Sequence, residues 1–82
     1  MKFVTKVKFE TFEKVNQFIR VITNFESDVD LVSGRYVINA KSAMGVYSLD
    51  LTKELELNIY EKVEGETEKL VQELRDLGII AE

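Results

Sequence analysis

Histidine, cysteine and proline are all absent from this 82-residue chain, and the first two absences exclude whole classes of chemistry. Without cysteine there is no disulfide and no thiolate metal ligand. Without histidine there are no imidazole ligands, no Ser-His or Cys-His dyads and no histidine general base. We therefore expect no catalytic residues and no enzymatic activity, and neither a metal nor another cofactor.

Long apolar runs and a basic charge balance are missing as well. No stretch approaches the ~18 apolar residues that cross a bilayer, and the opening MKFVTKVKFE alternates apolar with charged residues, unlike a signal peptide. The formal net charge is −4, whereas nucleic-acid binders need a clustered basic face. The sequence predicts a soluble cytoplasmic protein that binds neither nucleic acid nor membranes.

The composition is that of one globular domain. Apolar residues make up 45% and charged residues 32% of the chain, so disorder is not expected. A chain of this length is too short for two independent cores. We predict a single domain over residues 1–82.

Four segments alternate apolar and polar residues with the period of two that is typical of half-buried strands. In the first, Lys2, Lys6 and Lys8 are expected on a solvated face or edge. The pair Ser33-Gly34 is a turn signal that predicts a hairpin between the second and third segments. The inward residues expected are Phe3, Thr5, Val7 and Phe9; Val29 and Leu31; Tyr36, Ile38 and Ala40; and Leu55, Leu57 and Ile59.

Two longer segments have helical periodicity. TFEKVNQFIRVITNF begins with Thr11 in position to cap a helix, and GETEKLVQELRDLG ends at Gly78, where a left-handed cap is expected. The acidic residues near strand and helix ends are interpreted as solvated or helix N-terminal charges: Glu54, Glu56, Glu64, Glu66 and Glu68. The expected core residues are Phe12, Val15, Phe18, Ile19 and Ile22, and Leu70, Val71, Leu74 and Leu77.

These elements, with a short helical turn after the hairpin, give the order β-α-β-β-α-β-α. Strands with one polar face each favour an antiparallel sheet with water on one side. The sequence therefore predicts an α+β fold in which helices cover a single face of a four-stranded antiparallel sheet.

The segment KSAMGVYSLDL, residues 41–51, resembles the signature around the regulatory serine of HPr, the phosphocarrier of the bacterial phosphoenolpyruvate-dependent sugar phosphotransferase system. The preceding SDVDLVSGRYVINA is similar to the second and third strands of that family. The resemblance implies an HPr-like open-faced β-sandwich of order βαββαβα, in agreement with the elements above. It also implies protein partners, among them HPr kinase/phosphorylase and a transcriptional regulator, and a monomer or homodimer.

The resemblance fails where the family carries out its chemistry. HPr proteins have a phosphoacceptor histidine at the start of the first helix, an arginine two residues later and then a proline. Counting back from Ser42 places these positions at Thr11, Glu13 and Lys14. A threonine phosphoester is too stable for a reversible relay, and Glu13 repels a phosphoryl group. The chain is similar in this respect to the histidine-less HPr-like regulators of catabolite repression.

Ser42 has two compatible interpretations. As a helix N-cap its hydroxyl contributes about 0.5–2 kcal/mol. As the family's regulatory serine it accepts a phosphate beside the backbone N–H groups of the turn that follows. Met44 and Tyr47 are candidates for an exposed apolar patch with Lys41 adding positive charge, although Met44 fits a core position equally well.

Three functions stay open from the sequence. The first is a regulatory, protein-binding HPr-like module switched by phosphorylation of Ser42. The second is a phosphotransfer component with a different acceptor, Thr11. The third is an interaction module that keeps only the fold and has no link to sugar uptake.

Overall fold

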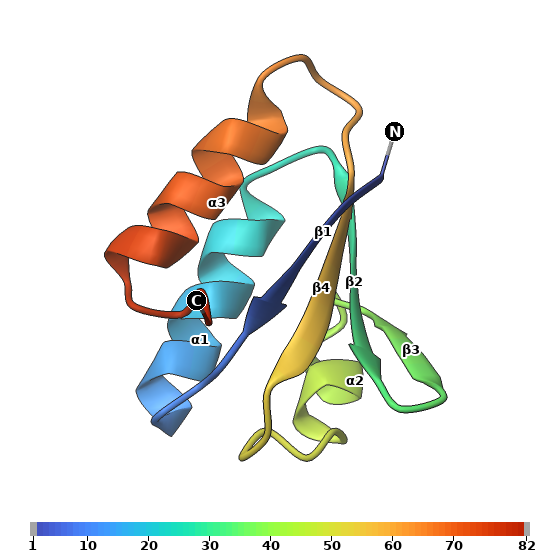
Figure 1. Cartoon of the computed structure of the whole chain (residues 1–82), viewed down its shortest axis with the longest axis vertical. Coiled ribbons are helices and arrows are strands. Elements are labelled where there is room, and N and C mark those ends of the chain that lie inside the picture. The colour runs from blue at the N-terminus through green and yellow to red at the C-terminus, as the bar shows by residue number, and fades with distance from the viewer. Residues whose placement is uncertain (1, 82) are drawn as a thin grey trace.

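The chain folds into a four-stranded antiparallel sheet with helices on one face (Figure 1). A computed structural model describes residues 2–81. The strand order is β1-β4-β2-β3, so β1 and β3 lie at the two edges. The predicted α+β open-faced sandwich of order βαββαβα is confirmed. The elements are β1 (Lys2–Val7), α1 (Phe12–Thr23), β2 (Asp28–Ser33), β3 (Tyr36–Asn39), α2 (Ala43–Tyr47), β4 (Leu55–Tyr60) and α3 (Glu66–Asp76).

The core lies between the sheet and the two long helices. The inward residues of β4 are buried as predicted, and so are Val29 and Leu31 on the neighbouring β2. Their burial removes large aliphatic side chains from water, which is the main favourable term in folding. The fully or almost fully buried core residues include Val7, Phe9, Val15, Phe18, Ile22, Val29, Leu31, Leu55, Leu57, Ile59, Leu70, Leu74 and Ile79.

Both predicted helix caps are confirmed. The Thr11 hydroxyl accepts a hydrogen bond of 3.2 Å from the N–H of Lys14 in the first turn of α1. After α3, Gly78 has φ +75°, a left-handed conformation that side-chain-bearing residues rarely adopt. The N–H groups of Gly78 and Ile79 then donate back to the carbonyls of the last turn of α3, so the helix ends in a Schellman motif.

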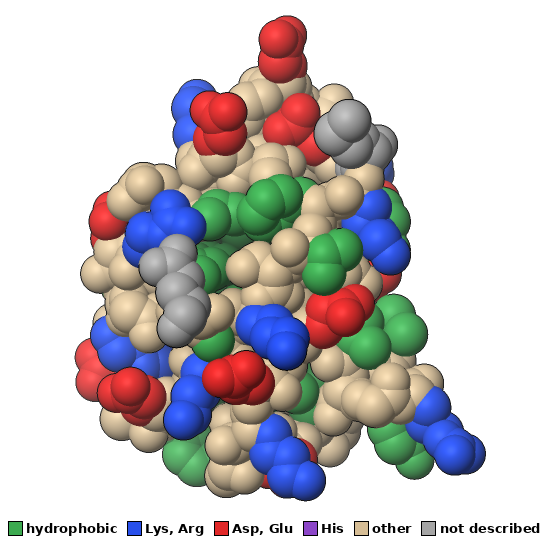
Figure 2. Space-filling model, in the orientation of Figure 1, with side chains coloured by type: hydrophobic (Ala, Val, Ile, Leu, Met, Phe, Trp, Pro, Cys, Tyr) green, Lys and Arg blue, Asp and Glu red, His purple; other side chains and the backbone are tan. Residues whose placement is uncertain are grey.

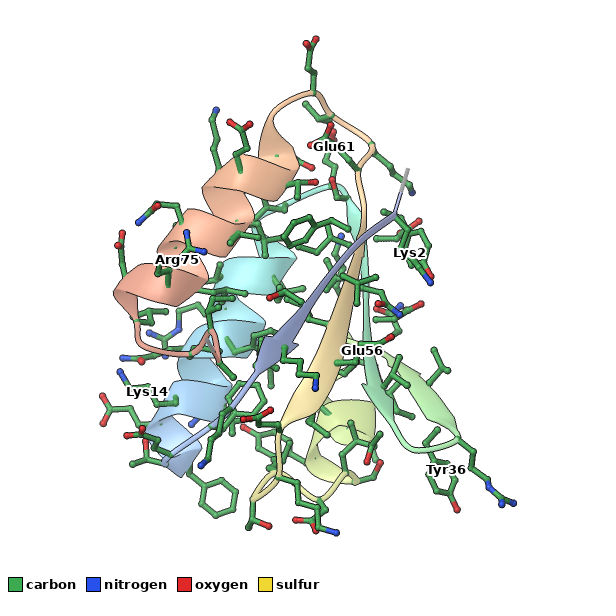
Figure 3. All side chains as sticks on the ribbon, viewed as in Figure 1. Lys2, Lys14, Tyr36, Glu56, Glu61 and Arg75 are labelled. Atoms are coloured by element: carbon green, nitrogen blue, oxygen red, sulfur yellow. The ribbon has the colours of Figure 1, made fainter. Side chains whose placement is uncertain are left out.

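Three aromatic residues predicted to face the core are exposed instead: Phe3 by 40%, Phe12 by 74% and Tyr36 by 65%. Phe3 lies at the outer end of an edge strand, where it borders a groove beside α3. Tyr36 begins β3 in a hairpin that projects beyond the helices (Figures 1 and 3). Phe3 and Tyr36 lie on the side of the sheet that was expected but are not fully covered, whereas the ring of Phe12 lies beside Tyr47 of α2. Four other predicted core residues are only half-buried: Thr5, Ile19, Ile38 and Leu77.

Glu66 joins three segments at the N-terminal end of α3. Its carboxylate accepts hydrogen bonds from the N–H of Glu26 (3.2 Å) and from the N–H and hydroxyl of Ser27 (2.9 and 2.6 Å). The buried Ser27 hydroxyl in turn accepts the N–H of Lys62 at 3.0 Å. The network therefore connects the α1–β2 loop, the β4–α3 loop and the first turn of α3, a role in addition to the helix-end charge that the sequence predicts.

These hydrogen bonds lower the pKa of the Glu66 carboxyl from its ordinary value of 4.5, with the Ser27 hydroxyl as the largest cause. Because the pKa is lower in the folded state, the carboxylate stabilises the fold above pH 4.5, and this contribution is lost as the pH falls through the folded-state pKa. In Glu66→Gln the free energy of unfolding should therefore fall less steeply below pH 4.5 than in the wild type. Urea unfolding at a series of pH values measures this slope. Ser27→Ala, which removes the strongest donor, should also reduce it, and an unchanged slope in both variants would contradict the assignment.

Candidate protein-binding site

The helix α2 is short and is held in place at both ends. The Ser42 hydroxyl accepts the N–H of Gly45 at 3.4 Å, so the predicted N-cap is confirmed. At the other end, the hydroxyl of Ser48 donates to the carbonyl of Gly45 at 2.6 Å. Val46 is fully buried and anchors the helix to the core. The result is a single helical turn fixed to the sheet, with Ser42 exposed at its start.

Gly45 allows α2 to lie against β3. A Cβ atom added at this position would lie only 2.6 Å from Cγ2 of Ile38 and 3.3 Å from the Ser42 hydroxyl oxygen. Real Cβ atoms essentially never approach another heavy atom so closely, so a side chain here requires the helix or the strand to shift, or the Ile38 side chain to change its rotamer. The glycine within this otherwise apolar segment is therefore explained by packing.

Aromatic side chains from α1 and α2 meet beside this turn. The rings of Phe12 and Tyr47 have centroids 6.4 Å apart at an interplanar angle of 36°, and the Tyr47 hydroxyl donates a hydrogen bond to the side-chain oxygen of Asn16. Met44 lies one turn before Tyr47 on α2 and is 87% exposed, so it does not fill the core. We refer to Phe12, Met44 and Tyr47 as the α1–α2 surface. It brings two segments about thirty residues apart into one exposed apolar area.

The three residues that the resemblance aligns with the phosphotransfer site of HPr lie at the start of α1. The Thr11 hydroxyl caps α1, and Glu13 is exposed in the first turn. The ammonium of Lys14 donates to the carbonyl of Leu77 at 2.5 Å, which ties α1 to the end of α3. A shallow groove of about 220 Å³ opens here and is lined by Phe9, Glu10, Thr11, Phe12, Val15, Leu51 and Thr52.

Lys41 lies next to Ser42 in the chain, but its ammonium donates to the carbonyl of Phe25 at 2.7 Å, just after the end of α1. Its positive charge also contributes to the lowered pKa of Glu66. Lys41 therefore has a structural partner, and its role in binding a partner protein stays a prediction.

Phe12 belongs to the α1–α2 surface and Asn16 bonds to its Tyr47, although the sequence predicts neither of them there. The helical period assigns Phe12 to the core-facing stripe, because it lies three residues before Val15. One feature of the sequence favours exposure of Phe12 instead: it is the first helical residue after the Thr11 cap, at the very end of the helix. The structure directs its side chain to Tyr47 on α2.

Metal-binding clusters and membrane-spanning helices are not found over residues 2–81. No cluster of three or more acidic side chains in this range is arranged to hold a metal ion. None of the helices described is both long enough and apolar enough to cross a membrane.

The antiparallel sheet, the two long helices on one face and the capped turn of α2 beside the start of α1 define an HPr-like open-faced sandwich. The family model described as the PTS HPr component phosphorylation site matches residues 13–78. The chain therefore belongs to the HPr family of the phosphotransferase system. HPr itself is a phosphocarrier rather than a catalyst.

Solved structures show the same fold. The phosphocarrier protein HPr from Bacillus anthracis strain Ames aligns with a TM-score of 0.69 at 18% identity, over 90% of each chain. The histidine-containing phosphocarrier protein of Mycoplasma aligns with a TM-score of 0.67 at 16% identity, over 100% of each chain. A search among curated proteins gave no match. At these identities the two structures support the fold, and the family assignment rests on the family model.

Proposed function

We propose that this chain is a regulatory, protein-binding member of the HPr family, which docks partner proteins through the α1–α2 surface and is switched by phosphorylation of Ser42. The observation that carries the proposal is the exposed apolar area formed by Phe12, Met44 and Tyr47 directly beside an exposed Ser42. The chain contains no histidine, so phosphohistidine transfer is excluded. Binding is the function that this surface supports.

The chemistry of the surface suits a docking site. Aromatic side chains provide large contact areas at a small cost in entropy, and an exposed methionine adapts to the shape of a partner. Phosphorylation of Ser42 adds about −1.5 to −2 charges two residues before Met44. A phosphate at the border of an apolar surface attracts partners with basic side chains and repels partners with acidic ones. The partners proposed are HPr kinase/phosphorylase and a transcriptional regulator of the kind found in this family.

A second candidate is phosphotransfer with Thr11 as the acceptor. Thr11 is exposed and occupies the family's histidine position, but its hydroxyl oxygen already accepts the N–H of Lys14. Its neighbour Glu13 is exposed in the same turn and would repel an incoming phosphoryl group. A third candidate is an interaction module outside sugar uptake, which would use the α1–α2 surface without modification of Ser42.

HPr kinase and ATP should place one phosphate on Ser42 of the purified protein, as identified by mass spectrometry of its peptides. Ser42→Ala should abolish the incorporation, whereas Ser48→Ala, a serine at the other end of α2, should leave it intact. If the kinase docks on the α1–α2 surface, Met44→Asp should lower the kcat/KM for phosphorylation by about tenfold or more, because it places a charge at the centre of an apolar contact.

Val63→Asp is the matched control, since Val63 is an exposed valine in the β4–α3 loop at the opposite end of the sheet (Figure 1). It should be phosphorylated at the wild-type rate. Phosphate found on Thr11 after incubation with phosphoenolpyruvate and enzyme I would favour the second candidate. The absence of any phosphate on Ser42 would favour the third.

A further inference from the structure

The edge of the sheet at β1 is only partly covered. The carbonyl of Lys6 accepts the N–H of Ala81 at 2.9 Å, so the backbone of Lys6 points away from β4. Backbone direction alternates along a strand, and Val4 and Lys2 therefore point outward as well. Within residues 2–81, no hydrogen bond reaches the outward N–H and C=O of Val4.

The C-terminal segment already begins a further strand along this edge. Ile80 forms an antiparallel bridge with Val7, and the N–H of Lys8 donates to the carbonyl of Ile79 at 2.8 Å. This pairing covers the end of β1 that is nearer to α1. The remaining stretch, residues 2–5, continues the same strand edge beyond this pairing.

An apolar groove runs beside this free stretch, between β1 and α3. It has a volume of about 510 Å³ and exposes Phe3, and Figure 2 shows the apolar side chains in the hollow between the strand and the helix. In Figure 3, Arg75 projects from α3 on one side of this region and Lys2 lies on the other side of β1. The groove is lined by Phe3, Glu61, Thr67, Glu68, Val71, Gln72 and Arg75.

The other face of β1 carries two lysines, and Glu56 of β4 is the cross-strand partner of Lys6. Lys2, Val4 and Lys6 share the face of the sheet that carries no helix, and both lysines are exposed. The ion pairs found in the described part of the chain, Lys62–Asp28 and Lys53–Asp50, involve neither of them. A second copy of β1 paired antiparallel about Val4 would need the position opposite Lys6, which Ala81 already occupies, and would bring Lys2 next to Lys6, which is repulsive. An acidic side chain opposite Lys2 would be attracted.

We propose that residues 2–5 of β1 are a docking site for an extended peptide that adds to the sheet as an antiparallel strand. Its apolar side chains would enter the groove beside Phe3 and Val71. The alternate side chains, on the other face, would be acidic, with one directly opposite Lys2 and within diagonal reach of the Lys6 side chain. Main-chain hydrogen bonds to Val4 provide the affinity, and the two faces provide the specificity, as in other cases of strand addition.

A peptide that alternates valine and glutamate is the probe, titrated into the ¹⁵N-labelled full chain. The largest amide shifts should fall in residues 2–5, with slower hydrogen exchange at the Val4 N–H. A peptide of the same composition with its valines and glutamates in separate blocks should bind at least about tenfold more weakly, as should one that alternates valine and lysine.

Val4→Pro removes the outward N–H but leaves the bonds between β1 and β4, since those come from the neighbouring residues. It should weaken binding of the valine-glutamate peptide by about tenfold. Lys2→Glu combined with Lys6→Glu tests the charge without touching the backbone, and should reverse the preference toward the valine-lysine peptide. Shifts centred on the α1–α2 surface, unchanged binding by both variants, or a homodimer formed through β1 would each overturn the proposal.

Discussion

Replacing Phe18 with alanine is expected to lower the free energy of unfolding by about 3–5 kcal/mol. Phe18 is fully buried in α1, and its ring packs edge to face against Phe9, with centroids 5.1 Å apart at an angle of 71°. Truncation loses the transfer free energy of the ring, leaves a cavity and removes the aromatic contact. Domains of this kind are stable by about 5–15 kcal/mol in total, so the variant should lose a large share of its stability.

Phe12→Ala is the matched control, because it is the same substitution in the same helix. Phe12 is 74% exposed, so its replacement should cost no more than about 1 kcal/mol. Urea unfolding followed by circular dichroism gives both values. A similar loss in the two variants would show that Phe12 is packed as tightly as Phe18, and the α1–α2 surface would then lose one of its three members.

Replacing Gly45 with valine is expected to cost about 1–3 kcal/mol and to displace α2 from β3. Even the first added carbon would lie 2.6 Å from Ile38, and the two valine methyl groups have to fit in the same space. Because the Ile38 methyl is attached directly to the Cβ of its residue, it can move aside only together with the strand or by a change of rotamer. The displacement should also slow the phosphorylation of Ser42, whose hydroxyl is bonded to the Gly45 N–H.

Ala43→Val is the control for a valine in this helical turn: valine is a poorer helix former than alanine but a better one than glycine, so propensity alone would not make Gly45→Val destabilising. Ala43 is exposed in the same turn, so valine there should cost only about 0.5–0.7 kcal/mol. The stability of both variants is measured by urea unfolding, and the position of α2 by the amide shifts of residues 43–47. If Gly45→Val were no more destabilising than Ala43→Val, the close approach of α2 to β3 would not be the reason for a glycine at position 45.

Two of the residues that the resemblance aligns with the phosphotransfer site of HPr have structural roles in this chain. Thr11 caps α1, and Lys14 holds the end of α3 through a hydrogen bond to Leu77. We propose the exposed apolar area beside Ser42 as the surface that binds a partner, and the outer edge of β1 lies in a separate part of the molecule.

The elements themselves can be predicted from the sequence. Alternation predicts the inward residues of β2 and β4, and the capping residues Thr11 and Gly78 mark the ends of the long helices. These signals act over a few residues, because hydrogen bonds at helix ends and the side of a strand that a residue occupies are local properties. The absence of histidine is a property of composition alone, and it is sufficient to exclude phosphohistidine transfer.

Exposure and contact between distant segments are decided only by the tertiary structure. Periodicity reports the side of an element on which a residue lies, but not whether another element covers that side. For this reason periodicity assigns Phe3, Phe12 and Tyr36 to the core although they are exposed, and it leaves the place of Met44 open. The contact of Gly45 with Ile38 and that of Phe12 with Tyr47 depend on how the elements pack. The sequence alone thus determines the elements and excludes a chemistry, whereas packing sets the surfaces that are available to partners.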